Sequence, residues 1–346
     1  MKVVLEKFLL LWLVVSSGIA FVWPALAATL PESWRMLLGD PFVAGKPYLP
    51  PLMSVTMFAI GALLPHDELR QVIRRWPAVA GGTLLQYTSM PLLAYLTSRL
   101  FGLSGPDYIG VVLVGCVPGA MASNVLTMNA RGNTSYSVSL TTASTLLSPL
   151  AVPLLMGLAL ASEKDVSLDF LKTSRSLLLT VVGPVLLGHI LSRRFAWMER
   201  VARHAGATVA NLTILYIIAV VVGLTRAELA GSSAYVVWVL LVVNVLGYLA
   251  GYLGGRVMQL PDTMRRALTL EIGMQNAGLG ATLATQLFPD QHAIAMAPAL
   301  YTFGCMLTGT MLAHLWSRRQ THDSASAPAA AVLPSRPVCE SLEVPL

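Results

Sequence analysis

Long apolar stretches, separated by short polar ones, run along the chain from about residue 8 to residue 316. They form ten segments, at about residues 8–30, 48–64, 77–98, 107–131, 134–160, 168–191, 205–224, 233–256, 263–287 and 291–316. Most reach the length of about 20 residues that a helix needs to cross the hydrocarbon core of a bilayer. The pattern therefore predicts an all-α polytopic membrane protein with ten transmembrane helices, numbered here as spans 1 to 10.

Two of the spans are interrupted at the depth where a membrane helix would continue. Span 4 reads GCVPGAMASN over residues 115–124, and span 9 reads EIGMQNAG over residues 271–278. Proline lacks the backbone donor that a helix needs, and glycine allows backbone angles outside the helical range. A pair of interrupted spans in corresponding halves of a chain is typical of the binding site of a secondary transporter. We therefore expect an ion-coupled carrier with its ion near the two breaks.

In span 4, Pro118 and Gly119 are expected to end a first half-helix. Ser123 and Asn124 are expected to cap a second half-helix that runs to about Arg131. A broken helix leaves carbonyl groups at one end, which suit a cation, and N–H groups at the other, which suit an anion. The alternative is a simple proline kink, in which Ser123 and Asn124 bond to a neighbouring helix.

Span 5 favours a binding site over a kink. Its first half holds nine hydroxyl residues: Thr134, Ser135, Ser137, Ser139, Thr141, Thr142, Ser144, Thr145 and Ser148. Ser137 and Thr141 are four residues apart and share a helix face. Close helix packing explains many of these hydroxyls. It does not explain a hydroxyl-lined face next to a broken helix that carries Ser and Asn, whereas a set of oxygen ligands does.

Span 9 contains Glu271, while every other acidic residue falls in a loop, at a span end or in the tail. A carboxylate at bilayer depth is costly and marks a functional site with a partner. The alternative is a surface pair with Arg265 or Arg266, both close by in sequence. Against it, the apolar residues 267–270 carry the helix inward before the carboxylate is reached. The interpretation as a cation site is therefore favoured, because hard cations are bound by oxygen atoms.

Further oxygen ligands are available around Glu271. Freed carbonyls of Ile272 and Met274 and the amide of Gln275 lie within the same break. Gln86 in span 3 is an uncharged amide near mid-membrane. Most such amides only bond to a neighbouring helix, but Gln86 would complete a coordination shell if span 3 packs on the second break.

Composition supports a membrane protein and excludes several classes. Of the 346 residues, 55% are hydrophobic and only 12% are charged, against roughly 25% charged in soluble domains. The net charge of +6 does not indicate nucleic-acid binding, because the basic residues are spread over interhelical loops. The three cysteines, Cys116, Cys305 and Cys339, show no spacing typical of a zinc site or a disulfide framework.

The basic residues predict the orientation. Fifteen Lys and Arg residues lie on the side of the membrane that holds both chain ends, and seven lie on the other side. Because Lys and Arg accumulate in cytoplasmic loops, both termini are expected in the cytoplasm. Residues 1–317 are expected to form the transporter domain, and residues 318–346 a disordered cytoplasmic tail.

Span 1 has two interpretations. Lys2 and Lys7, the apolar run that follows them and the ALA sequence at residues 25–27 resemble the three regions of a secretory signal. The apolar run continues to Leu30, and an even number of spans agrees with the charge distribution. Both observations favour a retained membrane helix.

With both breaks in view, the chain resembles the bile acid:sodium symporter family over roughly residues 5–317. The resemblance is strongest in PGAMASN at 118–124, ARGN at 130–133, SVSLT at 137–141, SP at 148–149 and EIGMQN at 271–276. It implies two inverted five-helix repeats. Spans 1, 2, 6 and 7 would form a panel, and spans 3, 4, 5, 8, 9 and 10 a core in which broken spans 4 and 9 cross.

The resemblance also implies two bound sodium ions. The first would be held by Ser123, Asn124, Ser137, Thr141 and Glu271. The second would be held by Gln86, Gln275, Glu271 and the backbone oxygens of Ile272 and Met274. All the side chains that these two sites require are present in the sequence.

The expected substrate is a small organic anion, bound near the half-helix that starts at about Asn276. Asn276 and the backbone N–H groups around Ala122 and Ala277 are the candidate donors, with Met121 beside them. Family members often carry a hydroxyl residue in the place of Met121, and some carry His-Asn where this chain has Cys305-Met306. The cavity is therefore expected to be less polar than theirs. The resemblance implies two substrate classes, between which the sequence does not choose: a 2-oxo or hydroxy acid, which is favoured, and a bile-acid-like carboxylate, which comes second.

The sequence thus predicts a sodium-coupled symporter, a monomer of a bacterial inner membrane without an obligate protein partner. One alternative is a sodium-independent or proton-linked exporter of organic or metalloid anions, because Cys116 precedes Pro118 by two residues. An intramembrane enzyme is disfavoured, since the sequence has neither an HExxH nor a GxSxG motif. A non-transporting receptor is a further alternative.

Overall fold

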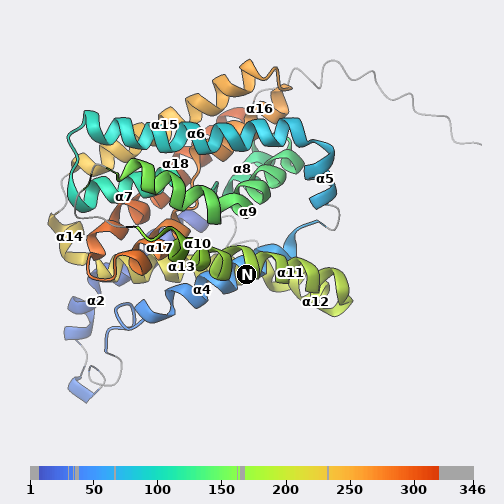
Figure 1. The fold of residues 1–346 in the computed structure, drawn as a ribbon. Helices are drawn as coiled ribbons and strands as arrows, with labels where there is room; N and C mark the ends of the chain where they lie inside the picture. The colour runs from blue at the N-terminus through green and yellow to red at the C-terminus, as the bar shows by residue number, and fades with distance from the viewer. Residues whose placement is uncertain are drawn as a thin grey trace, which may run out of the picture.

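The computed structural model describes residues 8–29, 31–33, 35, 39–65, 68–161, 163, 168–231 and 234–318, and this part of the chain is built from helices (Figure 1). In chain order they are α2 (Leu9–Ala28), η1 (Lys46–Tyr48), α4 (Leu49–Leu63), α5 (Glu68–Arg74), α6 (Trp76–Leu100), α7 (Gly105–Cys116), α8 (Ala122–Asn129), α9 (Thr134–Ala159), α10 (Phe170–Leu177), η2 (Leu178–Val182), α11 (Gly183–Arg194), α12 (Ala196–Val201), η3 (Ala202–Gly206), α13 (Ala207–Leu224), α14 (Arg226–Gly231), α15 (Ala234–Val257), α16 (Asp262–Gly273), α17 (Ala277–Leu287), η4 (His292–Ala295) and α18 (Met296–Ser317). The prediction of an all-α fold is confirmed. The predicted tail from residue 319 onward lies outside the described residues.

Each of the ten apolar segments contains helix, and within the described residues six stretches are long and apolar enough to cross a membrane. They are Leu9–Ala28, Thr134–Ala159, Phe170–Arg194, Ala196–Leu224, Ala234–Val257 and His292–Ser317. The remaining four segments are α4 with 15 residues, α6, and the two interrupted pairs α7–α8 and α16–α17. Exposed leucines such as Leu150, Leu154 and Leu158 recur every four residues along α9, as expected of a face that contacts lipid.

Proline residues set several helix starts. α4, α6, α7 and α11 each have Pro at the first or second position, where the missing N–H leaves no helical hydrogen bond unmade. Span 6 is less regular than the sequence predicts, because the turn before Pro184 at the start of α11 widens to a π-helical turn, η2. Such π turns are local adjustments within otherwise α-helical segments.

The helices form two layers. In one layer α4 packs against α11 and α13, and α13 packs against α2. In the other α6 packs against α7, α9 and α15, while α15 packs against α16 and α18. In the view of Figure 1 the first layer lies below the second, and the two interrupted pairs belong to the upper layer or its boundary with the lower one.

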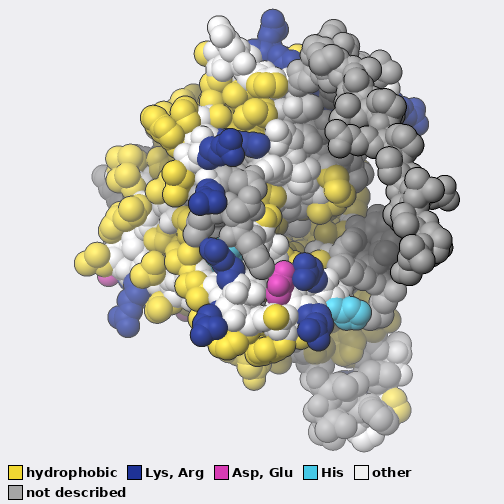
Figure 2. Space-filling view, turned by 90° about the vertical axis from the view of Figure 1, so that its right-hand side faces the viewer, with side chains coloured by type: hydrophobic (Ala, Val, Ile, Leu, Met, Phe, Trp, Pro, Cys, Tyr) yellow, Lys and Arg dark blue, Asp and Glu magenta, His cyan; other side chains and the backbone are white. Residues whose placement is uncertain are grey.

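One end of the molecule is rich in basic side chains. Figure 2 looks onto the end of the molecule where α5, α11 and α12 lie, and shows Lys and Arg spread over that face. The exposed basic residues of this region include Arg74, Arg75, Arg193, Arg194, Arg200 and Arg203. A surface of this charge cannot lie in hydrocarbon, so this end faces water or lipid headgroups.

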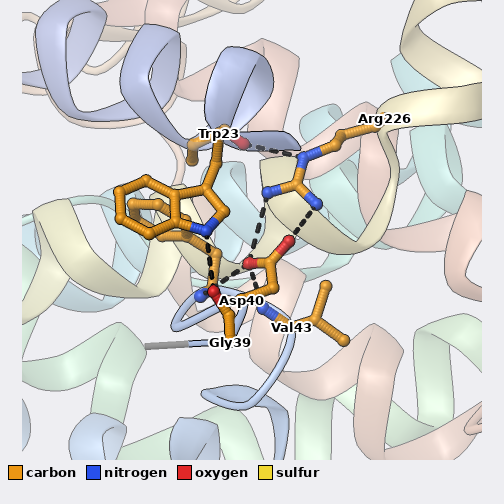
Figure 3. Close-up of polar contacts among 7 residues, drawn as sticks. Trp23, Gly39, Asp40, Val43 and Arg226 are labelled. Atoms are coloured by element: carbon orange, nitrogen blue, oxygen red, sulfur yellow. Dashed lines mark hydrogen bonds and ion pairs between the residues drawn. The ribbon is translucent and has the colours of Figure 1, made fainter. Parts of the chain in front are cut away.

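At the opposite end, α2 is fastened to the rest of its layer by Arg226, at the start of α14 (Figure 3). Its guanidinium donates to Asp40 Oδ2 at 2.5 Å and to the carbonyl of Ala20 in α2 at 2.7 Å. The indole of Trp23 donates to the carbonyl of Gly39 at 3.0 Å. Partial burial raises the pKa of Asp40, but hydrogen bonds from Arg226 and the N–H of Val43, with the charge of Arg226, hold it below its ordinary value.

Asp40→Asn is therefore expected to lower the free energy of unfolding by about 1–2 kcal/mol at pH 7, and with it the melting temperature of the purified protein. A carboxylate whose pKa is lowered by folding contributes stability above its unfolded pKa of about 3.9, and this stability is lost as pH falls through the lower folded value. The difference between wild type and variant should thus persist at neutral pH and shrink only below about pH 4. Thermal unfolding across pH measures it. A difference that is unchanged in strong acid would contradict the assignment to this ion pair.

Candidate ion and substrate site

Both predicted helix interruptions are present. α7 ends at Cys116 and α8 begins at Ala122, while α16 ends at Gly273 and α17 begins at Ala277. Pro118 supplies no donor, and the residue before it, Val117, is extended with ψ of 156°, as steric contact with a following proline favours. The sequence therefore correctly located the two places where the helical backbone opens.

The two extended connections lie side by side. Gly119 and Gln275 form an isolated antiparallel bridge. The N–H of Ala120 donates to the carbonyl of Met274 at 2.7 Å, and the N–H of Asn276 donates to the carbonyl of Pro118 at 2.8 Å. Backbone groups that lack helical partners in a membrane protein must find others, and here each break supplies partners to the other.

The expected capping of α8 is wrong, whereas α17 is capped. Ser123 and Asn124 lie in the first turn of α8, whose N-cap position is Met121, and no side chain caps this helix. The Ser123 hydroxyl instead donates to Glu271 Oε2 at 2.5 Å. A hydrogen bond to an ionised carboxylate is stronger than one between two neutral groups, such as a hydroxyl and the backbone N–H that it would cap. In α17 the Asn276 Oδ1 accepts from the N–H of Leu279 at 3.1 Å.

Glu271 lies in the interior, 2% exposed, at the crossing of the two breaks. Its Oε1 accepts from the Thr141 hydroxyl at 2.6 Å, and Ser137, one turn before Thr141 on α9, lies beside the carboxylate. Asn124 Oδ1 lies 3.4 Å from the Thr141 hydroxyl. The structure thus brings together all five residues predicted for the first sodium site, from α8, α9 and α16.

The alternative of a surface pair for Glu271 is excluded by this burial. Arg265 and Arg266 both pair with Asp262, at 2.6 and 3.1 Å. Arg266 also donates to the carbonyl of Ala130 at 2.8 Å. None of the ion pairs found among the described residues involves Glu271. The hydrogen-bond partners of the carboxylate in the described structure are the neutral hydroxyls of Ser123 and Thr141.

The residues predicted for the second site are also adjacent. Gln86 Nε2 donates to Gln275 Oε1 at 2.8 Å, and Gln275 Nε2 donates to the carbonyl of Ile272 at 2.6 Å. Both amides are almost completely buried. Gln86 Oε1 is a buried acceptor without a hydrogen-bond partner in the described structure. Buried acceptors are normally satisfied, so this oxygen suits a cation.

The predicted substrate residues border a narrow cleft between the two helix layers. Met57, Ile60 and Leu64 of α4 and Val185 of α11 line one side, and Met121, Thr141, Thr142, Thr145 and Asn276 line the other. Because the Asn276 Oδ1 caps α17, its amide NH₂ group remains for a ligand in the cleft. Ala122 and Ala277 lie next to these residues, but the N–H of Ala277 donates to the carbonyl of Gln275 at 2.8 Å.

Three buried polar residues at the site were not expected from the sequence. Thr127 in α8 donates to the Ser137 hydroxyl at 3.3 Å. Asn244 in α15 and Tyr301 in α18 both contact the carbonyl of Gly273 at the second break. An amide in the middle of an apolar span is a recognisable signal in the case of Asn244. Thr127 and Tyr301 offer no such signal, because both types are common in membrane helices.

The sequence model of the Sodium Bile acid symporter family matches residues 50–232, more than half of the chain. The chain belongs to this family. It is 35% identical over 311 residues to the uncharacterized sodium-dependent transporter YocS of Bacillus subtilis, covering 89% of this chain and 90% of that protein. It is 33% identical to the probable chloroplastic sodium/metabolite cotransporter BASS1 of Arabidopsis thaliana, covering 77% of this chain and 66% of that protein.

The human ileal sodium/bile acid cotransporter is also similar, at 29% identity over 72% of this chain and 73% of that protein. These relatives confirm the predicted family, and they are transporters rather than enzymes. Membership of the bile acid symporter family supports sodium-coupled symport across a membrane and does not specify the substrate. The site described above is therefore the candidate binding site for both the ion and the substrate.

Proposed function

We propose that this protein is a sodium-coupled symporter of a small organic anion, which it carries by alternating access. The observation that carries the proposal is Glu271, a buried carboxylate without a basic partner in the described structure, placed among oxygen atoms where two broken helices meet. An uncompensated charge at this depth is unfavourable. A bound sodium ion compensates it and finds oxygen ligands there.

Two sodium ions are assigned to the two neighbouring sets of ligands. The first takes the carboxylate of Glu271 with the oxygen atoms of Ser123, Asn124, Ser137 and Thr141. The second takes Gln86, Gln275 and the carbonyls of Ile272 and Met274, and shares Glu271. Hydroxyl groups that now donate to the carboxylate can present their lone pairs to the ion instead. The unpartnered Gln86 Oε1 supports the second ion.

The substrate binds in the cleft between the layers, beside the ions. One carboxylate and two sodium ions give a local charge of +1, and α8 and α17 direct their positive N-terminal ends toward the crossing. An organic monoanion is therefore stabilised once the ions are bound, which couples the two by differential affinity. Asn276 is the proposed side-chain donor, with the N–H groups around Ala122 and Ala277 close by and Met121 against the substrate body.

The cleft wall favours an anion with an apolar part. Met57, Ile60, Leu64 and Val185 offer only hydrocarbon and thioether surface opposite the hydroxyls of α9. The chemistry of these two walls suits a small 2-oxo or hydroxy acid first, and a bile-acid-like carboxylate second. The name of the human relative, a bile acid cotransporter, supports the second class, and that of the plant relative names only a metabolite.

Transport follows from movement of the two layers. We assign spans 1, 2, 6 and 7 to a panel and spans 3, 4, 5, 8, 9 and 10 to a core, as two inverted five-helix repeats. The observed packing of α2, α4, α11 and α13 in one layer supports this division. Movement of the core against the panel would expose the crossing to each side in turn.

The protein is placed in the inner membrane of a bacterium as a monomer, with both termini cytoplasmic. A bacterial sodium-dependent transporter that aligns with nearly the whole chain supports the assignment to a bacterial membrane. The basic face in Figure 2 supports the orientation, because Lys and Arg gather on the cytoplasmic side.

The driving force is sufficient. Two sodium ions with one monoanion move a net charge of +1, which contributes about 2.3 kcal/mol at 100 mV. A tenfold sodium gradient adds about 1.4 kcal/mol per ion. The total of about 5 kcal/mol supports accumulation on the order of a thousandfold.

The test is uptake by the full-length protein in proteoliposomes. Pyruvate, pantoate and taurocholate would be offered with an inward gradient of sodium, or of choline as the control. We expect sodium-driven uptake of at least one of them, and faster uptake with a negative interior because each cycle moves positive charge. Equal uptake with choline, or uptake driven by a proton gradient alone, would overturn the proposal in favour of the sodium-independent or proton-linked alternative.

A further inference from the structure

The carbonyl of Gly273 at the second break is held by two side chains from other helices. Asn244 Nδ2 in α15 donates to it at 2.7 Å, and the Tyr301 hydroxyl in α18 donates to it at 2.8 Å. All three residues are buried. In an uninterrupted helix this carbonyl would accept from the N–H of Ala277, which donates to the carbonyl of Gln275 instead. The two side chains therefore replace the helical bond that the break removes.

The network behind these donors is complete. The Thr308 hydroxyl donates to Asn244 Oδ1 at 2.7 Å, which fixes the amide so that its NH₂ group faces Gly273. The same NH₂ group lies 3.3 Å from the Tyr301 hydroxyl. A buried network in which each member is satisfied holds its parts in one arrangement. The Gly273 carbonyl is thus fixed from two sides.

Close helix packing allows Asn244 to reach the break. Gly247 and Gly251 follow Asn244 on the same face of α15, and a Cβ at either would press on α16: at Gly247 within 3.2 Å of Gly273 Cα, and at Gly251 within 2.7 Å of Thr269 Cα. With no side chain at either position, the two backbones come together. The Asn244 side chain, one turn earlier, then lies directly against the carbonyl that it binds.

The lone pairs of the three adjacent carbonyls explain which of them can serve an ion. A carbonyl oxygen has two lone pairs. The Gly273 oxygen has both of them occupied. The oxygens of Ile272 and Met274 each accept one hydrogen bond, from Gln275 Nε2 at 2.6 Å and from the N–H of Ala120 at 2.7 Å. One lone pair therefore remains on each of the two carbonyls that flank Gly273.

We propose that Asn244 and Tyr301 are positioning residues for the second sodium site. By holding the Gly273 carbonyl, they fix the peptide planes on either side of it and so direct the carbonyls of Ile272 and Met274 to the ion. This inference rests on the proposed sodium function. Without the two donors, only the bond from the N–H of Met274 to the carbonyl of Leu270, at 3.0 Å, holds the peptide after Gly273, and glycine has no side chain to resist its rotation. The oxygen ligands would then lose their fixed spacing.

The test is a sodium titration of the purified full-length protein, in which the melting temperature is the readout. Choline chloride keeps the ionic strength constant. Tyr301→Phe removes one hydroxyl, and Asn244→Leu removes both amide groups at similar size. We expect each to raise the half-saturating sodium concentration about tenfold or more. The matched control is Tyr108→Phe in α7, another buried tyrosine. The Tyr108 hydroxyl donates to the carbonyl of Ala159 at the end of α9, at 2.6 Å, and takes no part in the network around Gly273.

The outcomes separate the two hypotheses. A shift in Tyr301→Phe and Asn244→Leu, with Tyr108→Phe within twofold of wild type, supports the positioning role. If all three variants match wild type, or all three shift equally, the positioning role is refuted while the sodium site stands. If wild type itself shows no stabilisation by sodium, the proposed function fails first. The sodium-free melting temperature of each variant reports loss of fold separately.

Discussion

Replacing Glu271 with glutamine is expected to lower sodium-driven uptake by at least about 100-fold, equivalent to about 2.7 kcal/mol. Glutamine keeps the length of the side chain and can still bond to Ser123 and Thr141. It removes the negative charge, which is the main attraction for either ion. The same variant should lose the rise in melting temperature that sodium gives the wild-type protein. Uptake in proteoliposomes and sodium-dependent thermal unfolding measure the two effects.

Stability without sodium distinguishes a lost ion site from a damaged fold. A buried carboxylate without a counter-charge destabilises the protein, so Glu271→Gln should melt at the same temperature as wild type or higher when sodium is absent. Glu163→Gln is the control, because Glu163 lies outside the crossing and pairs with Arg99 at 3.0 Å. It should leave transport unchanged. Sodium-driven uptake that survives in Glu271→Gln would contradict the assignment of the ion site.

Local sequence signals predicted the helices and the places where two of them break. Pro118 and Gly119 act on their own backbone, and an apolar run of membrane length is visible without knowledge of its neighbours. The same holds for Glu271, whose cost in a membrane does not depend on its partners. These features could therefore be located before the structure was known.

Contacts between distant parts of the chain could not be predicted in the same way. Ser123 was expected to cap α8, and it bonds instead to Glu271, a residue 148 positions away. Similarly, the pairing of the two breaks through Gly119 and Gln275 joins segments from different halves of the chain. A family resemblance supplied the ligand sets but not Asn244 or Tyr301, and the amide of Asn244 in an apolar span, although visible in the sequence, does not reveal which group it binds. Their role depends on how closely α15 and α18 pack on the break.

Gly119→Ala is expected to abolish sodium-driven transport although it adds only one methyl group. A Cβ at Gly119 would overlap the carboxylate of Glu271, meeting Oε1 and lying 2.8 Å from Cδ. Neither group can move freely, since Gly119 is bridged to Gln275 and the carboxylate is held by Ser123 and Thr141. The methyl group therefore displaces either the main ligand or the pairing of the two breaks.

Uptake by Gly119→Ala is expected to fall by at least about 100-fold. Overpacking of a close-packed site typically costs about 1–3 kcal/mol, and displacement of the ligands lowers the rate further. Gly304→Ala in α18 is the matched control, since a Cβ there meets no atom within 4 Å. This control should transport like wild type. The half-saturating sodium concentration does not depend on the amount of protein reconstituted. A change in it therefore reports damage to the ion site and not a lower yield of protein. If Gly119→Ala binds sodium with wild-type affinity, the Glu271 carboxylate is not the main sodium ligand, and the ion must be held elsewhere in the crossing.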